Sequence, residues 1–154
     1  MDAHEGGWKR IDSDFPQLSF SIPDNWKAVE VRAGAIAALS PEVDEGRYRS
    51  NVTIAEMPLS DVGDINAFGD EHLRELERVL TDFQLIEVSD AQVGPLPGVR
   101  ITASFRQGAY DLTLDEWLGL TDVTLVTATA VAADFDYPDE VENFEQIVAS
   151  IGNA

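Results

Sequence analysis

Four consecutive segments in the second half of the chain are predicted to form strands, with no helical pattern between them. They are QLIEV at 84–88, VRITASF at 99–105, AYDLTLDEWLGL at 109–120 and VTLVTATAVA at 123–132. In the second and third segments apolar and polar residues alternate, which is typical of strands that are buried on one face. Because short connections join antiparallel neighbours, we expect these segments to pair in an antiparallel sheet.

Helical patterns occur in two other places. Between Asp64 and Phe83 the apolar residues fall on one stripe opposite acids and arginines, and Asp64 is a suitable N-cap. A second helix is predicted from Pro138, a favoured first-turn residue, to Gly152. Its apolar stripe begins at Val141 and continues through the last turns.

Shorter strand patterns fill the first third of the chain, at 18–22, 27–31, 34–39 and 51–57. The order is therefore several strands, a helix, four strands and a helix. Strands and helices do not alternate regularly, which favours an α+β fold with a single antiparallel sheet flanked by helices over a doubly wound fold.

The length of 154 residues and the hydrophobic content of 44% fit one domain. We expect residues 1–17 to form a partly disordered tail and lead-in, and residues 18–151 to form the domain. The sequence has no cysteine, which excludes disulfides, thiolate zinc sites and cysteine nucleophiles.

The formal net charge is −19, and all ten basic residues lie between Lys9 and Arg106. Such a charge repels phosphate backbones and anionic membrane surfaces, so we expect neither nucleic acid binding nor membrane insertion. Solubility explains the charge, and recognition of a basic partner is the alternative. The N-terminus lacks the order of a signal peptide, so we expect a cytoplasmic protein, or a cell-envelope protein if a leader has been removed.

Residues with catalytic or metal-binding chemistry are few. The two histidines are His4, in the expected tail, and His72, which we expect to be solvated on the first helix. Asp134, Asp136 and Asp139 weakly resemble a calcium loop, but they lack its central glycine and are better explained as the acidic start of a helix. The sequence therefore predicts no catalytic residue, no metal ligand and no cofactor, and a protein that is not an enzyme.

One candidate contact surface lies on the segment 110–120. Trp117 is out of register with Leu112 and Leu114 and shares the opposite face with Thr113 and Asp115. Trp117 could pack in the core or anchor a partner. We hypothesise that Trp117, Asp115 and Thr113 form a surface for an apolar partner with a basic rim.

A second candidate is the basic and aromatic tip formed by Arg47, Tyr48 and Arg49 in a polar loop. A solvated loop tip is the simpler explanation of these residues.

Five stretches together resemble the Mog/PsbP-like superfamily. They are FSIPDNW, NVTIAEMPL, LIEVSDAQVGPLPGVRITASF, LVTATA and the terminal helix that changes from acidic to apolar. The resemblance is greatest to DcrB-like domains, which include Eag-type secretion chaperones, and to actinobacterial LpqN-type proteins. It covers roughly Leu18 to Ile151. It implies an α/β/α sandwich with a sheet of about six or seven strands. It also implies that GPLPG at 94–98 is a hairpin turn whose glycines take dihedrals that other residues avoid.

Members of this superfamily mostly bind other molecules, and they share no catalytic residues. The resemblance implies a non-enzymatic protein-binding domain, of the adaptor or secretion-associated chaperone type, whose partner is a secreted effector or a secretion component. An LpqN-like envelope domain that binds a small apolar or lipidic ligand is the alternative, and a carboxylate-dependent hydrolase is a weaker one. The first hypothesis predicts an open apolar patch or groove, and the second predicts a closed apolar pocket.

Overall fold

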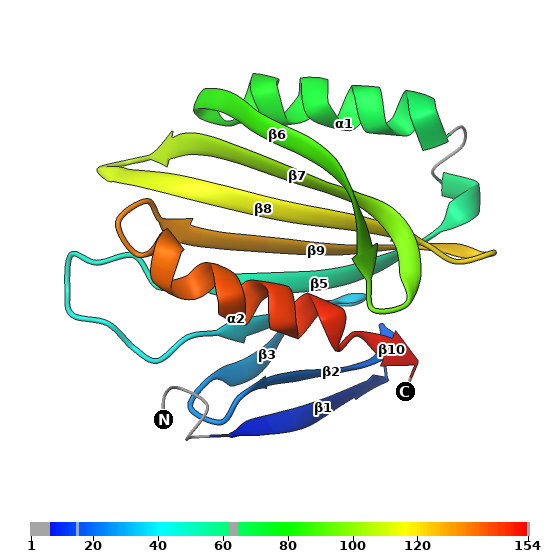
Figure 1. Ribbon diagram of the computed structural model, residues 1–154, viewed down its shortest axis with the longest axis horizontal. Helices are drawn as coiled ribbons and strands as arrows, with labels where there is room; N and C mark the ends of the chain where they lie inside the picture. The colour runs from blue at the N-terminus through cyan, green and yellow to red at the C-terminus, as the bar shows by residue number, and fades with distance from the viewer. Residues whose placement is uncertain (1–6, 15, 62–64, 154) are drawn as a thin grey trace.

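The computed structural model describes residues 7–14, 16–61 and 65–153. Within them, two antiparallel sheets and two α-helices make up the fold (Figure 1). The larger sheet has seven strands in the order β3-β4-β5-β9-β8-β7-β6, and the smaller has three in the order β1-β2-β10. The predicted α+β fold with an antiparallel sheet of six or seven strands is confirmed. The smaller sheet was not predicted.

The large sheet comprises β3 (Lys27–Arg32), β4 (Ala35–Leu39), β5 (Asn51–Pro58), β6 (Thr81–Val93), β7 (Leu96–Gln107), β8 (Tyr110–Leu120) and β9 (Thr124–Ala133). The small sheet comprises β1 (Trp8–Asp14), β2 (Gln17–Pro23) and β10 (Gly152–Asn153). The helices are the short 3-10 helix η2 (Leu59–Asp61), α1 (Ile65–Val79) and α2 (Tyr137–Ala149). The four consecutive strands predicted from the sequence are β6 to β9, and they lie side by side in chain order.

The GPLPG stretch forms the β6–β7 hairpin, as the resemblance implied. Val93 pairs with Leu96, and Gly94 in the turn has φ of 57°, which favours glycine. Gly98 has a different role, because it lies within β7 and a Cβ there would be 1.8 Å from the carbonyl oxygen of Leu118. The expectation that both glycines are needed for their dihedral angles is therefore wrong for Gly98, which is needed for close packing of β7 on β8.

Two boundaries differ from the sequence expectations. Residues 8–14, assigned to a tail, form β1, in which Ile11 pairs with Phe20 of β2. The helix predicted to reach Phe83 ends at Val79, because β6 begins at Thr81 and Asp82 takes a positive φ of 56°. The proposed N-cap Asp64 and the tail residues 1–6 lie outside the described residues.

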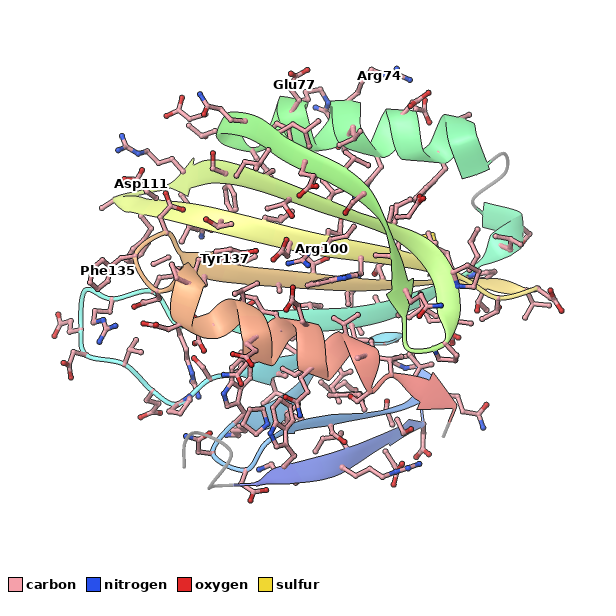
Figure 2. The ribbon with its side chains drawn as sticks, viewed as in Figure 1. Arg74, Glu77, Arg100, Asp111, Phe135 and Tyr137 are labelled. Carbon is pink, nitrogen blue, oxygen red and sulfur yellow. The ribbon has the colours of Figure 1, made fainter. Side chains whose placement is uncertain are left out.

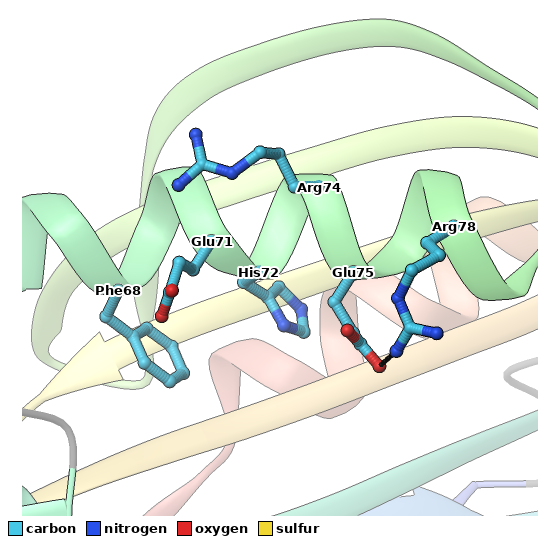
Figure 3. Close-up of a pocket in the computed structure, with 6 residues that line it drawn as sticks. All are labelled: Phe68, Glu71, His72, Arg74, Glu75 and Arg78. Atoms are coloured by element: carbon cyan, nitrogen blue, oxygen red, sulfur yellow. Dashed lines mark hydrogen bonds and ion pairs between the residues drawn. The ribbon is translucent and has the colours of Figure 1, made fainter.

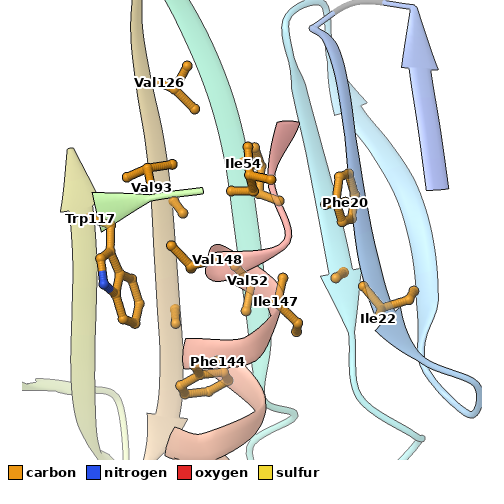
Figure 4. Packing of buried hydrophobic residues seen from close by; sticks show 14 of the residues in the cluster. Phe20, Ile22, Val52, Ile54, Val93, Trp117, Val126, Phe144, Ile147 and Val148 are labelled. Carbon is orange, nitrogen blue, oxygen red and sulfur yellow. The ribbon is translucent and has the colours of Figure 1, made fainter. Parts of the chain in front are cut away.

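The main core lies between α2, the small sheet and one face of the large sheet (Figure 4). Phe20 and Ile22 of β2 and Phe144 of α2 are each at most 1% exposed there. The opposite face of the sheet carries two smaller apolar clusters. One of them, Ile101, Leu118 and Leu125, is covered by Phe68 and Leu73 of α1. The two helices therefore cover opposite faces of the sheet.

Among the residues that the structure describes, no helix is both long and apolar enough to cross a membrane.

Candidate functional site

The row Thr113, Asp115 and Trp117 is buried beneath α2. The exposed fractions are 8% for Thr113, 0% for Asp115 and 4% for Trp117. The hypothesis assumed that this face of β8 is poorly covered, and that assumption is wrong because Phe144 and Tyr137 of α2 belong to the same core cluster as Trp117. These side chains are not a surface that a partner can reach in this structure.

Asp115 is the centre of a buried polar network. It accepts hydrogen bonds from Arg100 Nε at 3.1 Å and Nη2 at 2.9 Å, from Thr102 Oγ1 at 2.6 Å and from the hydroxyl of Tyr137. Arg100 also donates from Nη1 to Glu145 Oε2 at 2.8 Å. Arg100 and Tyr137 lie side by side between the sheet and α2 (Figure 2). The network therefore fastens α2 to β7 and β8, and it satisfies the charge of Asp115.

The network raises the pKa of two of its members, Arg100 and Tyr137. Partial burial opposes the charge of Arg100, but its hydrogen bonds to Asp115 and Glu145 outweigh this and raise its pKa. Burial, together with the hydrogen bond to Asp115, raises the pKa of Tyr137. Arg100 also lies over the ring of Trp117, with its guanidinium carbon 4.6 Å from the ring centroid. These contacts indicate a structural role.

The loop tip Arg47, Tyr48 and Arg49 is held by contacts within the protein. Arg47 Nη2 lies 3.1 Å from Asp136 Oδ1, and Arg49 Nε donates to the backbone oxygen of Ser40. The ring of Tyr48 packs edge-on against Tyr110, with ring centroids 5.5 Å apart. Arg47 remains half exposed at 52% of its side chain, whereas Tyr48 and Arg49 are partly buried, so the tip is not an open basic and aromatic cluster.

His72 and Glu116 form a second polar link, between α1 and β8, that the sequence reading missed. His72 Nε2 bonds to Glu116, which is 6% exposed and also accepts from Thr129 Oγ1 at 2.7 Å. The hydrogen bond to Glu116 raises the pKa of His72. His72 was expected to be solvated, and this expectation is wrong because its ring stacks on Phe68 and its side chain is only 23% exposed. The signal in the sequence was Glu116 itself, a charged residue in the apolar row of Leu114 and Leu118.

Two hollows flank α1. One holds about 420 Å³ and is lined by six residues of α1 itself, with Phe68, His72 and Glu75 on one side of the helix and Arg74 on the other (Figure 3). The second holds about 320 Å³ and lies between α1 and the sheet. Its lining is mostly apolar and comprises Gly69, Asp70, Leu73, Val88, Gly98, Val99, Ile101, Leu118, Leu120 and Leu125. We refer to this second hollow as the α1 groove.

The strand beside the α1 groove exposes large apolar side chains. Leu85, Ile86 and Val88 of β6 are 49%, 61% and 47% exposed, and we call these three residues the β6 patch. Ile86 has no partner in the β6–β7 register, because the register shifts between Leu85 and Glu87. Val88 also lines the α1 groove, so the patch and the groove form one continuous apolar surface. This α1–β6 surface is the candidate functional site.

No family model and no curated protein matches the sequence. Solved structures do match. LpqN, involved in cell envelope biogenesis of Mycobacterium tuberculosis, aligns with a TM-score of 0.69 and 13% identity over 97% of this chain and 92% of that chain. The cyanobacterial PsbP of Synechocystis aligns with a TM-score of 0.66 and 14% identity over 97% of this chain and 94% of that chain.

The Ran-binding protein Mog1p of Saccharomyces cerevisiae gives a TM-score of 0.63 and 12% identity over 96% of this chain and 95% of that chain. Identities this low establish a common fold and nothing beyond it. The chain has the Mog/PsbP-like fold that its sequence motifs indicated.

Proposed function

We propose that this protein is a non-enzymatic protein-binding domain that contacts its partner through the α1–β6 surface. The observation that carries the proposal is the β6 patch, where three neighbouring apolar side chains are each about half exposed beside an apolar groove. Large contiguous apolar patches on the surface of a folded protein are often sites of interaction with a partner. The description of Mog1p as a Ran-binding protein shows that this fold supports protein binding.

Several observations support a binding role over catalysis. Asp115 and Glu145 are both paired with Arg100, and the side chain of Asp115 is fully buried. Among the described residues, no group of three or more potential ligands could hold a metal ion. A binding domain needs neither a free catalytic acid nor a metal site.

Within this class, the more specific proposal is an adaptor or secretion-associated chaperone that acts in the cytoplasm on a secreted effector or a secretion component. The alternative is an envelope domain that holds a small apolar or lipidic ligand. The α1 groove and the likeness to LpqN favour this alternative. The volume of the groove, about 320 Å³, is at the lower end for a small-molecule site. Its continuity with the exposed β6 patch favours a protein partner.

The test compares capture of partners by matched variants. The full chain, an Ile86→Ser/Val88→Ser variant and a Phe135→Ser control are used as bait in extracts of the native host. Phe135 is 89% exposed and lies in the turn before α2, so the control removes a still more exposed apolar group elsewhere (Figure 2). We expect wild type and control to retain the same partner and the double variant to lose it. Retention by all three proteins would contradict the proposal, and a co-purified lipid lost from the double variant would favour the alternative.

A further inference from the structure

We infer that β6 binds its partner by strand addition, and that the partner segment is extended, with apolar and basic residues in alternation. This inference rests on the proposed function of the α1–β6 surface and specifies what occupies it. The partner would add an eighth strand to the seven-stranded sheet, on the outer side of β6.

The position of β6 provides the backbone edge that strand addition needs. β6 is 13 residues long and is the last strand of the large sheet, paired with β7 on one side. Within the described residues, no strand pairs with its outer side. Alternate N–H and C=O groups of such a strand point outward and can pair with another chain.

The two edge strands of the large sheet, β6 and β3, differ in length and in the sign of their charges. Proteins protect edge strands by keeping them short, by placing charged residues (lysine above all) or proline on them, and by β-bulges. β3, at the other edge, is 6 residues long and begins with Lys27 and ends with Arg32. β6 is more than twice as long and contains neither lysine nor proline, and its protection consists of three acids and two register irregularities.

The charge of β6 determines which partner fits. The strand carries three acids, Asp82, Glu87 and Asp90, and no Lys or Arg, so its formal charge is −3. A second copy of this chain would bring the same −3 strand against it, in a protein of formal charge −19. Like charges directly opposite each other destabilise strand pairing, whereas opposite charges favour it. The occupant is therefore a basic segment of another protein.

The two faces of β6 explain why apolar and basic residues would alternate in the partner segment. Leu85 and Val88 lie on the face of the sheet that α1 covers, since they pair with Ala103 and Ile101 of β7. Glu87 lies on the other face, because its register partner is Thr102. In an added strand, every second side chain would lie beside Leu85, Val88 and the α1 groove, and the others would lie beside Glu87. Apolar residues suit the positions of the first set beside Leu85 and Val88, and basic residues suit the second set. A basic residue also suits the position beside Asp90, because its register partner Val99 places Asp90 on the same face as Val88.

The experiment uses the full chain and synthetic peptides of about eight residues, a typical strand length. One peptide alternates valine and lysine, the second alternates valine and glutamate, and the third is the valine–lysine peptide methylated on alternate backbone nitrogens. Affinity is measured by titration, and hydrogen exchange of individual amides is followed by NMR. We expect the valine–lysine peptide to bind and to protect alternate amides of β6. We expect the other two peptides to bind at least about tenfold more weakly, because one repels the strand and the other cannot donate its hydrogen bonds.

A charge-reversed variant supplies a second readout. Glu87 is exposed, so Glu87→Lys is expected to leave the fold intact. It changes the formal charge of β6 from −3 to −1 and should therefore reduce the preference for the lysine peptide over the glutamate peptide. No binding of the valine–lysine peptide, equal binding of the methylated peptide, or protection of α1 amides without β6 amides would overturn the inference. Pairing of β6 with a second copy, seen as dimerisation, would overturn it as well.

These outcomes separate this inference from the proposed function. If the Ile86→Ser/Val88→Ser variant loses its native partner while β6 amides gain no protection, side chains alone bind the partner and strand addition is wrong. If that variant keeps its partner, the proposed function of the surface fails too.

Discussion

Replacing Trp117 with alanine removes an indole from the core beneath α2. The side chain is 4% exposed, it belongs to the same core cluster as Phe144, and Arg100 lies 4.6 Å above its ring. Truncation of a buried aromatic of this kind costs about 3–5 kcal/mol, because the lost contacts leave a cavity that the surrounding structure fills incompletely. For a chain of this length we expect the thermal midpoint to fall by roughly 6–20 °C.

The assay is urea denaturation followed by far-ultraviolet circular dichroism, which does not depend on the removed fluorophore. The denaturant slope should stay unchanged, so that the midpoint reports stability alone. A Val123→Ala control, at a site that is 70% exposed, should change the free energy of unfolding by less than about 0.5 kcal/mol. If Trp117→Ala lowers the free energy of unfolding by less than about 1 kcal/mol, the packing argument is wrong and Trp117 is again a candidate contact residue.

Further predictions concern the helix α1 and the close approach of two strands. Because the hydrogen bond to Glu116 raises the pKa of His72, protonated His72 stabilises the fold below its unfolded pKa of 6.5, and this contribution is lost as the pH rises through the folded pKa. Urea denaturation over a pH series should show this slope in wild type and not in His72→Gln, and equal slopes would contradict the link. Gly98→Ala should destabilise by more than about 2 kcal/mol, because the new Cβ would lie 1.8 Å from the Leu118 oxygen. Gly69→Ala, with nothing within 4 Å in the described part of the chain, should instead stabilise α1 by about 0.5–1 kcal/mol in the same assay, and similar effects of both changes would refute the steric argument.

The sequence could predict which face of β8 each side chain occupies, because strand periodicity is local. It placed Trp117 opposite Leu112 and Leu114, as the structure does. It could not predict what covers that face, because α2 begins at Tyr137, and its position over β8 depends on tertiary packing. The ion pair between Asp115 and Arg100 could not be predicted either. It depends on the register of β7 and β8, which places Arg100 opposite Trp117, two residues from Asp115.

The α1–β6 surface escaped prediction for a related reason. The segment QLIEV was assigned to a strand from its composition, but the register shift that exposes Ile86 has no signature in the pattern of apolar residues. Nor could the pattern show that β6 would lie at the edge of the sheet, since strand order depends on the whole fold. Turn chemistry was more informative, and the glycine and proline of the β6–β7 turn marked its place correctly.

Amide hydrogen exchange of the full chain, measured with and without the partner captured from the native host, tests the central claim most directly. The account predicts that protection gained on binding is concentrated in β6, between Gln84 and Gln92, with a smaller gain in α1 beside the groove. Protection confined to other elements, such as the loop around Arg47 or the small sheet, with β6 amides unchanged, would contradict it.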